Sequence, residues 1–150
     1  MSFSTTPNVT DFTSFLRGVV GIDPLYLPDA SPVIGYAFSV SMAIVSTDFA
    51  AYGANLYALM VYNLGADQVI NYAQDQTGRD YFVELRKSLG INLFLPGVTT
   101  SSGDSGTSQS RLNPEFMKNL TLGDLQNLKT PYGRAYLNFA QQAGSLWGMS

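Results

Sequence analysis

Apolar residues recur at helical spacing along most of the chain, and this pattern predicts a bundle of helices. Residues 11–20 form the first such stretch, with apolar side chains at i, i+3, i+4 and i+7: Phe12, Phe15, Leu16 and Val19. Gly21 can end this helix, and Asp23-Pro24 enforces a turn after it. The preceding residues 1–9 are polar, so we expect them to form a flexible lead.

Ser31-Pro32 predicts the start of a second helix, because serine is a common N-cap and proline fits the first helical position. This helix should run to about Ser46. Its buried side is expected to contain, with Met42 as a further candidate, Val33, Tyr36, Ala37, Val40 and Ile44. A row of small residues also recurs every four positions: Gly35, Ser39 and Ala43. Such a row permits close approach of another helix, from this chain or from a neighbouring one.

The third predicted helix covers residues 49–72, with Thr47 or Asp48 as its cap. The sequence is apolar on nearly all sides from Ala50 to Leu64, which indicates a central, buried helix. Its stripe is expected to be Tyr52, Leu56, Leu59 and Met60, with Asn63 and Leu64 as further candidates. Gly65 is a candidate kink or break.

The remaining helices follow the same spacing. Residues 79–89 predict an amphipathic helix that ends at Gly90, with Tyr81, Phe82, Leu85 and Leu89 inward and Arg79, Glu84, Arg86 and Lys87 outward. Two short helices are expected at 113–120 and 121–128. Thr130-Pro131 repeats the cap-plus-proline signal, and the last helix should run to about Ala143 with one apolar face: Tyr132, Tyr136, Leu137 and Ala140.

The segment 96–113 has a different character, since its middle consists almost entirely of Gly, Ser, Thr, Asp and Gln. It predicts one long extended loop or hairpin, because loops of this length in a compact domain are usually functional or disordered. We expect it to dock on a neighbouring chain by pairing backbone with a strand, although it could also be a plain spacer. The apolar tail, residues 144–150, should dock as well. The candidate interface residues are therefore Thr99, Thr100, Ser101, Ser102, Ser105, Thr107, Arg111, Leu146, Trp147 and Met149.

The length of 150 residues suits a single domain, 1–150. Charged residues make up 13% of the chain, against about 25% in typical proteins. Two explanations are open: a surface of uncharged polar residues, or a surface partly covered by neighbouring subunits. The net charge of −3 argues against a nucleic-acid reader. We expect no membrane span or signal peptide, since no long apolar run or basic leader is present.

The chemistry available to the side chains argues against an enzyme. The chain contains no histidine and no cysteine, which removes the commonest general base and the best metal ligands. Gly103-Asp104-Ser105-Gly106 matches the sequence around the nucleophile of trypsin-like proteases, but that mechanism needs a histidine. The acidic residues are scattered, and phosphate-binding glycine patterns are absent. We therefore expect no catalytic residues, no cofactor and no metal.

Two segments together resemble a known family. The first is the helix pair 31–46 and 49–64, which includes Leu56-Tyr-Ala-Leu-Met-Val-Tyr-Asn-Leu64. The second is Gly97-Val-Thr-Thr-Ser-Ser-Gly103, followed after a polar stretch by Leu128-Lys-Thr-Pro-Tyr-Gly-Arg-Ala-Tyr-Leu137. This order is similar to that of the head–tail connector (adaptor) proteins of tailed bacteriophages, over residues 11–140. At the place where members carry a histidine, this chain has Val61-Tyr62.

The resemblance implies an all-α bundle of four to five helices that assembles into a ring, dodecameric in that family. Such a ring joins the portal protein to a tail or neck protein, and genomic DNA passes through it without sequence recognition. The expected location is the head–tail interface of the virion, and the host cytoplasm during assembly. Two alternatives are another phage neck or tail-completion protein, and a small non-catalytic regulatory binding module.

Overall fold

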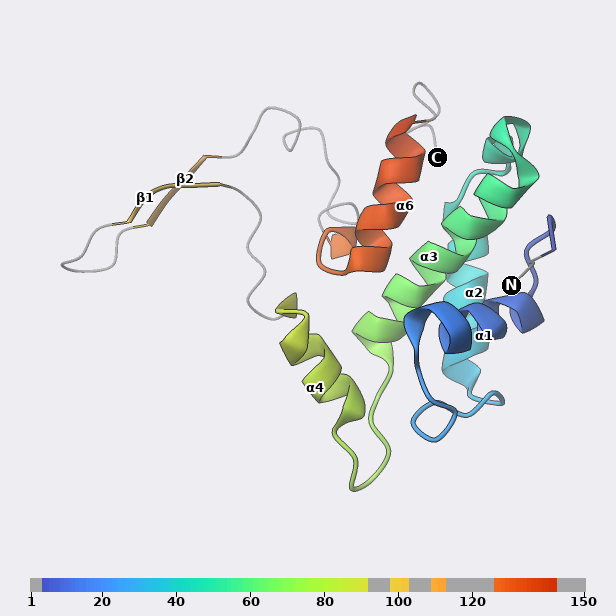
Figure 1. The fold of residues 1–150 in the computed structure, drawn as a ribbon, viewed down its shortest axis with the longest axis horizontal. Helices are drawn as coiled ribbons and strands as arrows, with labels where there is room; N and C mark the ends of the chain where they lie inside the picture. Colours follow the sequence, from blue (N-terminus) through green and yellow to red (C-terminus); the bar gives the residue numbers. More distant parts are fainter. Residues whose placement is uncertain (1–3, 92–97, 103–108, 113–125, 143–150) are drawn as a thin grey trace.

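The fold is a bundle of helices, seen in a computed structural model that describes residues 4–91, 98–102, 109–112 and 126–142 (Figure 1). The all-α bundle predicted from the sequence is confirmed. In chain order, the helices are α1 (Val9–Phe15), the π-helix η1 (Leu16–Val20), α2 (Pro32–Ile44), the 3-10 helix η2 (Thr47–Tyr52), α3 (Ala54–Tyr72), α4 (Tyr81–Ser88) and α6 (Pro131–Gln142).

Helix α3 is the centre of the bundle, as its nearly continuous apolar sequence predicts. It contacts α1, α2, η2, α4 and α6, and it runs between them in Figure 1. Most of its residues from Tyr57 to Ile70 are buried, including residues on every side of the helix. A helix that is apolar all round is stable in water only when neighbours cover all its faces, and α3 meets that condition.

Helix α1 packs its aromatic face against α3. Phe12 stacks on Tyr62 with ring centroids 6.0 Å apart, and Phe15 lies 5.9 Å from the same ring. Gly65 does not break α3, contrary to expectation; the helix continues through it. A Cβ at Gly65 would lie 2.7 Å from two atoms of the Phe12 ring. The glycine is therefore explained by the close approach of α1 and not by a kink.

The start of the bundle differs from the sequence prediction at two places. The Asn8 side chain caps α1 by accepting from the Asp11 N–H (2.8 Å), and Pro7 is buried, so residues 7–9 belong to the fold and not to a flexible lead. Val19 was expected to be buried and is 51% exposed. The wider π-helical turn rotates it outward and brings Val20 against the core.

Helix α2 occupies the predicted range, but the predicted buried face is wrong by about one residue. Tyr36 is 62% exposed and Ile44 is 42% exposed. Ala37 is buried as predicted, and Val33 and Met42 pack partly against the core. Ile34 and Ser41 are also buried, which was not predicted. Ser41 tolerates burial because its hydroxyl donates to the Ala37 carbonyl (2.8 Å). Ser31 is the N-cap residue as predicted, but its side chain makes no capping hydrogen bond.

The region before α3 is a separate 3-10 helix and not the first turns of α3. Ser46 caps η2 by accepting from the Asp48 N–H (3.3 Å), so neither Thr47 nor Asp48 is the cap. Gly53 then separates the two helices with φ of +147°, a conformation that favours glycine. As a result Tyr52, which was expected on the buried stripe, is exposed.

Helices α4 and α6 lie where the sequence predicts them. Phe82 is buried and Tyr81 and Leu85 are half-buried, as expected for the inner face of α4. Arg86 is not a solvated outer residue, because its guanidinium donates to the carbonyls of Ile70 (2.7 Å) and Ala73 at the end of α3. In α6 the predicted face is confirmed, with Tyr136, Leu137 and Ala140 buried.

The segment predicted to be a loop or hairpin contains two antiparallel strands, β1 (Val98–Ser102) and β2 (Gln109–Leu112). Val98 pairs with Leu112 and Ser102 with Gln109, with a register shift between Thr99 and Ser101. In Figure 1 the hairpin lies apart from the helices. The predicted short helix 113–120, most of 121–128 and the apolar tail 144–150 lie outside the described residues.

Candidate assembly surface

The interface residues predicted from the sequence fall into two groups. Those in the strands have a defined backbone register: Thr99 opposite Arg111, Ser101 opposite Ser110, and Thr100 at the irregularity between the two pairs. The others lie outside the described residues: Ser105, Thr107, Leu146, Trp147 and Met149. The hairpin geometry is therefore confirmed, whereas the docking role remains a prediction.

The hairpin has the backbone geometry needed to pair with another chain. Within the described residues its sheet consists of β1 and β2 alone. A two-stranded sheet exposes a row of backbone donors and acceptors on each outer edge, and such edges accept a further strand. Proteins usually cover or blunt edges of this kind.

The more informative surface is one side of α2, which the sequence marked only through its row of small residues. We call this side the outer face of α2, and it consists of the exposed residues Pro32, Gly35, Tyr36, Ser39, Ala43 and Ile44 with the half-buried Val33 and Val40. None of these residues is charged. The Ser39 hydroxyl donates to the Gly35 carbonyl (2.8 Å), so the hydroxyl proton is already bonded within the helix. Apart from the Tyr36 hydroxyl, the side chains of the outer face therefore lose few hydrogen bonds to water when the face is covered.

The outer face of α2 lacks a cover that its composition requires. All thirteen residues of α2 are uncharged, and the helix is apolar on all sides apart from its two serines and one glycine. Helices of this kind are normally buried all round, yet α2 packs on the bundle with one side only. Of the helices that the structure describes, none is both long and apolar enough to cross a membrane. Contiguous exposed apolar surface often marks a site of contact with another molecule.

The predicted small-residue row lies on this outer face and not inside the subunit. Gly35, Ser39 and Ala43 are all exposed, and a Cβ placed at Gly35 would meet nothing within 4 Å. The close helix approach expected from this row therefore does not occur within the described chain. The other possibility in that prediction, close approach of a helix from a neighbouring chain, stays a prediction.

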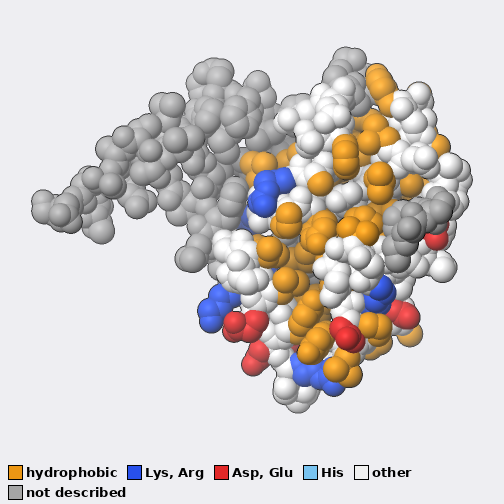
Figure 2. All heavy atoms as spheres, viewed as in Figure 1, with side chains coloured by type: hydrophobic (Ala, Val, Ile, Leu, Met, Phe, Trp, Pro, Cys, Tyr) orange, Lys and Arg blue, Asp and Glu red, His pale blue; other side chains and the backbone are white. Residues whose placement is uncertain are grey.

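The stretch of sequence that contains α2 and α3 carries little charge. Between residues 30 and 72 the chain carries only Asp48 and Asp67, and Asp67 is fully buried. Ion pairs join Arg17 with Asp29 (2.5 Å), just before α2, and Lys87 with Glu84 (3.5 Å) on α4. On the face drawn in Figure 2, hydrophobic side chains form a band and charged ones gather mainly toward one end.

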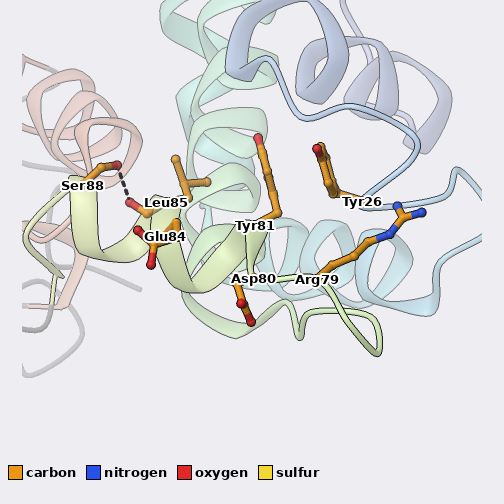
Figure 3. A pocket seen from close by; sticks show the side chains of 7 residues that line it. All are labelled: Tyr26, Arg79, Asp80, Tyr81, Glu84, Leu85 and Ser88. Atoms are coloured by element: carbon orange, nitrogen blue, oxygen red, sulfur yellow. Dashed lines mark hydrogen bonds between the residues drawn. The ribbon is translucent and has the colours of Figure 1, made fainter.

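An open pocket of about 630 Å³ lies beside α4, and its walls include Tyr26, Arg79 and Tyr81 (Figure 3). Tyr26 and Tyr81 stack with centroids 4.2 Å apart and ring planes within 6°. The Arg79 guanidinium lies 5.6 Å from the Tyr26 ring and donates to the Leu25 carbonyl. In Figure 3 Asp80 points away from the two tyrosines, and the Ser88 hydroxyl bonds to the Leu85 carbonyl (2.8 Å). These contacts attach the turn before α2 to α4.

A buried carboxyl joins α3 to the start of α6. Asp67 is fully buried, and its Oδ1 accepts a hydrogen bond from the Thr130 hydroxyl (2.5 Å). Thr130 also accepts from the Gly133 N–H (2.9 Å), as the predicted cap of α6. Asp67 Oδ2 has no hydrogen-bond partner among the described residues. The arrangement fixes α6 on the central helix.

The environment of Asp67 changes its acidity. Burial raises the pKa of Asp67 from 3.8 to about 7, and the Thr130 hydroxyl, the nearby Asn71 amide and Lys129 oppose that shift. Sequence reasoning placed Asp67 among scattered acids and missed this site. The available signal was an aspartate inside a helix that is otherwise apolar on nearly every side.

The described residues contain no group of three or more acidic, histidine or cysteine side chains that could hold a metal ion. Comparison with known proteins supplies no further guide, because no family model, curated protein or solved structure matches the chain. The feature that bears most directly on function is therefore the uncovered outer face of α2.

Proposed function

We propose that the chain is a structural subunit that assembles side by side with copies of itself. In the form that the sequence resemblance implies, these copies make a ring that connects the portal of a tailed bacteriophage to its tail or neck, in the virion. Genomic DNA would pass through the ring without sequence recognition. The observation that carries this proposal is the uncharged outer face of α2, which no part of the described chain covers.

The surfaces of the subunit suit a ring better than a two-fold dimer. A ring contact is heterologous, which means that one surface of a subunit meets a different surface of the next. The chain offers two unlike surfaces, the outer face of α2 and the open edges of the β1–β2 hairpin. The core of a protein interface is depleted of charge, and the outer face of α2 fulfils that requirement without exception.

Ser39→Arg is expected to prevent assembly without unfolding the subunit. Ser39 is exposed on a helix, so an arginine there stays hydrated in the single chain, but a neighbour would have to bury its charge. Light scattering of the wild-type chain, alone and mixed with the portal protein, should show species larger than a dimer. The variant should remain small under both conditions, with an unchanged melting temperature.

Thr10→Arg is the matched control, since Thr10 is a hydroxyl residue exposed on α1, away from the outer face of α2. It should assemble like the wild type. If the wild-type chain forms nothing larger than a dimer with or without the portal, the ring proposal is wrong and a small binding module becomes the better reading. If Ser39→Arg assembles normally, the outer face of α2 is not the contact.

The hairpin can be tested separately by replacing residues 101–106 with a Gly-Ser link. Because β1 and β2 lie apart from the helices, the helix content measured by circular dichroism should stay nearly the same. Assembly or attachment to the portal should fail, because the strand edges are shortened. Normal assembly of the shortened chain would mean that the hairpin is only a spacer.

A further inference from the structure

The proposed assembly leaves open what covers the outer face of α2, and the rest of the chain offers a candidate. We propose that it is the C-terminal segment, residues 143–150, of a second copy of the chain. This inference rests on the proposed function and adds the occupant of the surface. The segment follows directly from α6, whose last residue is Gln142, and it contains no charged residue.

The composition of the segment matches the surface. Its sequence, Ala143-Gly-Ser-Leu-Trp-Gly-Met-Ser150, places three large apolar side chains within four positions: Leu146, Trp147 and Met149. Of these, tryptophan belongs to the residue types that are enriched among those carrying most of the binding energy of protein contacts. The outer face of α2, which carries no charged side chain, can receive them.

The shape of the outer face of α2 can accommodate an aromatic side chain such as that of Trp147. Tyr36 and Ile44 are large exposed side chains, whereas Ser39 and Ala43 between them and Gly35 before Tyr36 have small side chains or none. The space above Gly35 is open, since a Cβ there would meet no atom within 4 Å. An indole can occupy this space, and its N–H needs an acceptor when it is buried. Ser39 can provide one, because its oxygen keeps lone pairs after donating its proton to Gly35.

The length of the segment is also sufficient to span α2. Eight extended residues reach roughly 27 Å, and a helix of thirteen residues, the length of α2, spans about 20 Å. The segment is therefore long enough to cover the whole outer face. Helices α2 and α6 both pack on α3, and the outer face of α2 points away from α3. In the proposed assembly, the end of α6 of an adjacent subunit supplies the segment to this face.

The sequence provides a built-in probe, because Trp147 is the only tryptophan in the chain. We would measure the emission maximum of Trp147 in the full-length protein over a wide range of concentration, with excitation at the red edge of its absorption to avoid the tyrosines. The expected result is a solvent-exposed emission at low concentration that shifts to shorter wavelength as the concentration rises. Ser39→Arg should weaken this transition by at least about tenfold, and Thr10→Arg should leave it unchanged.

Each other outcome overturns the inference in a distinguishable way. A short-wavelength emission at every concentration would place the segment on its own chain. A concentration-dependent shift that Ser39→Arg does not weaken would place it on another surface of the second copy. No shift at any concentration would mean that the segment does not dock. In that last case, if light scattering with the portal still shows rings, the proposed function stands and only the occupant is wrong.

Discussion

Gly133→Ala should destabilise the protein by about 3 kcal/mol, whereas Gly35→Ala should stabilise it by up to about 1 kcal/mol. Both changes add one methyl group to a helix. A Cβ at Gly133 would overlap the main-chain carbonyl oxygen of Asn127 and lie 2.8 Å from Asp67 Oδ1. A backbone atom cannot swing aside like the end of a side chain, so the start of α6 must move.

Gly35 offers the matched control because its added methyl group meets no atom within 4 Å. Alanine there gains helix propensity without overlap. Urea unfolding followed by circular dichroism measures both free energies of unfolding on the same scale. For Gly133→Ala a melting temperature lower by roughly 10 °C would accompany the loss. Equal effects of the two substitutions would show that α6 does not approach residues 126–128 and α3 as closely as described.

The second large effect concerns Asp67 and pH. The pKa of this carboxyl rises from 3.8 to about 7 in the folded protein because it is buried. The folded state therefore binds a proton that the unfolded state has released between these two values. The contribution of the protonated Asp67 carboxyl to the free energy of unfolding is fully present below pH 4 and is lost as the pH rises through about 7. Its size is on the order of 4 kcal/mol.

Asp67→Asn isolates this contribution, since an amide does not titrate in this range. The difference in unfolding free energy between wild type and Asp67→Asn should change steadily from pH 4 to pH 8 in favour of the variant. Thr130→Ser keeps the hydroxyl that bonds to Asp67 Oδ1, so it should retain the pH dependence of the wild type. A wild-type minus Asp67→Asn difference that is constant with pH would show that Asp67 is accessible to water.

The sequence predicted the positions of the helices well, and the physical reason is their regular spacing of apolar residues. Phe12, Phe15 and Leu16 are buried on one face of the first helical segment, and the continuous apolar run of α3 is central. The starts marked by proline at Pro32 and Pro131 are also confirmed. These features depend on local preferences that a single sequence displays directly.

The side of α2 that is buried could not be predicted in the same way. A helix shows which side is buried through the polar residues on its other side, and α2 has no charged residue to mark that side. The choice between Tyr36 and Ile34 as buried residues is made by packing against α3 and α1, which depends on distant parts of the chain. The same absence of a polar side is the reason for proposing the outer face of α2 as a contact surface.

Two other differences have local causes that the spacing of residues does not reveal. The π-helical turn at Leu16–Val20 rotates Val19 outward, and Gly53 separates η2 from α3. The Asp67 site depends on Thr130, which is 63 positions away in the sequence. The sequence Thr130-Pro131 predicted that Thr130 caps α6. The hydrogen bond from Thr130 to the buried Asp67 carboxyl, however, forms only when α6 packs on α3.

Electron microscopy of the chain assembled on the portal protein tests the proposed function most directly. The expected image is a closed ring of copies beneath the portal, in which the outer face of α2 lies against the neighbouring subunit. A ring in which this face is exposed to solvent would place the contact elsewhere. The absence of a ring, with the chain remaining a monomer or dimer beside an unoccupied portal, would contradict the assignment as a ring subunit.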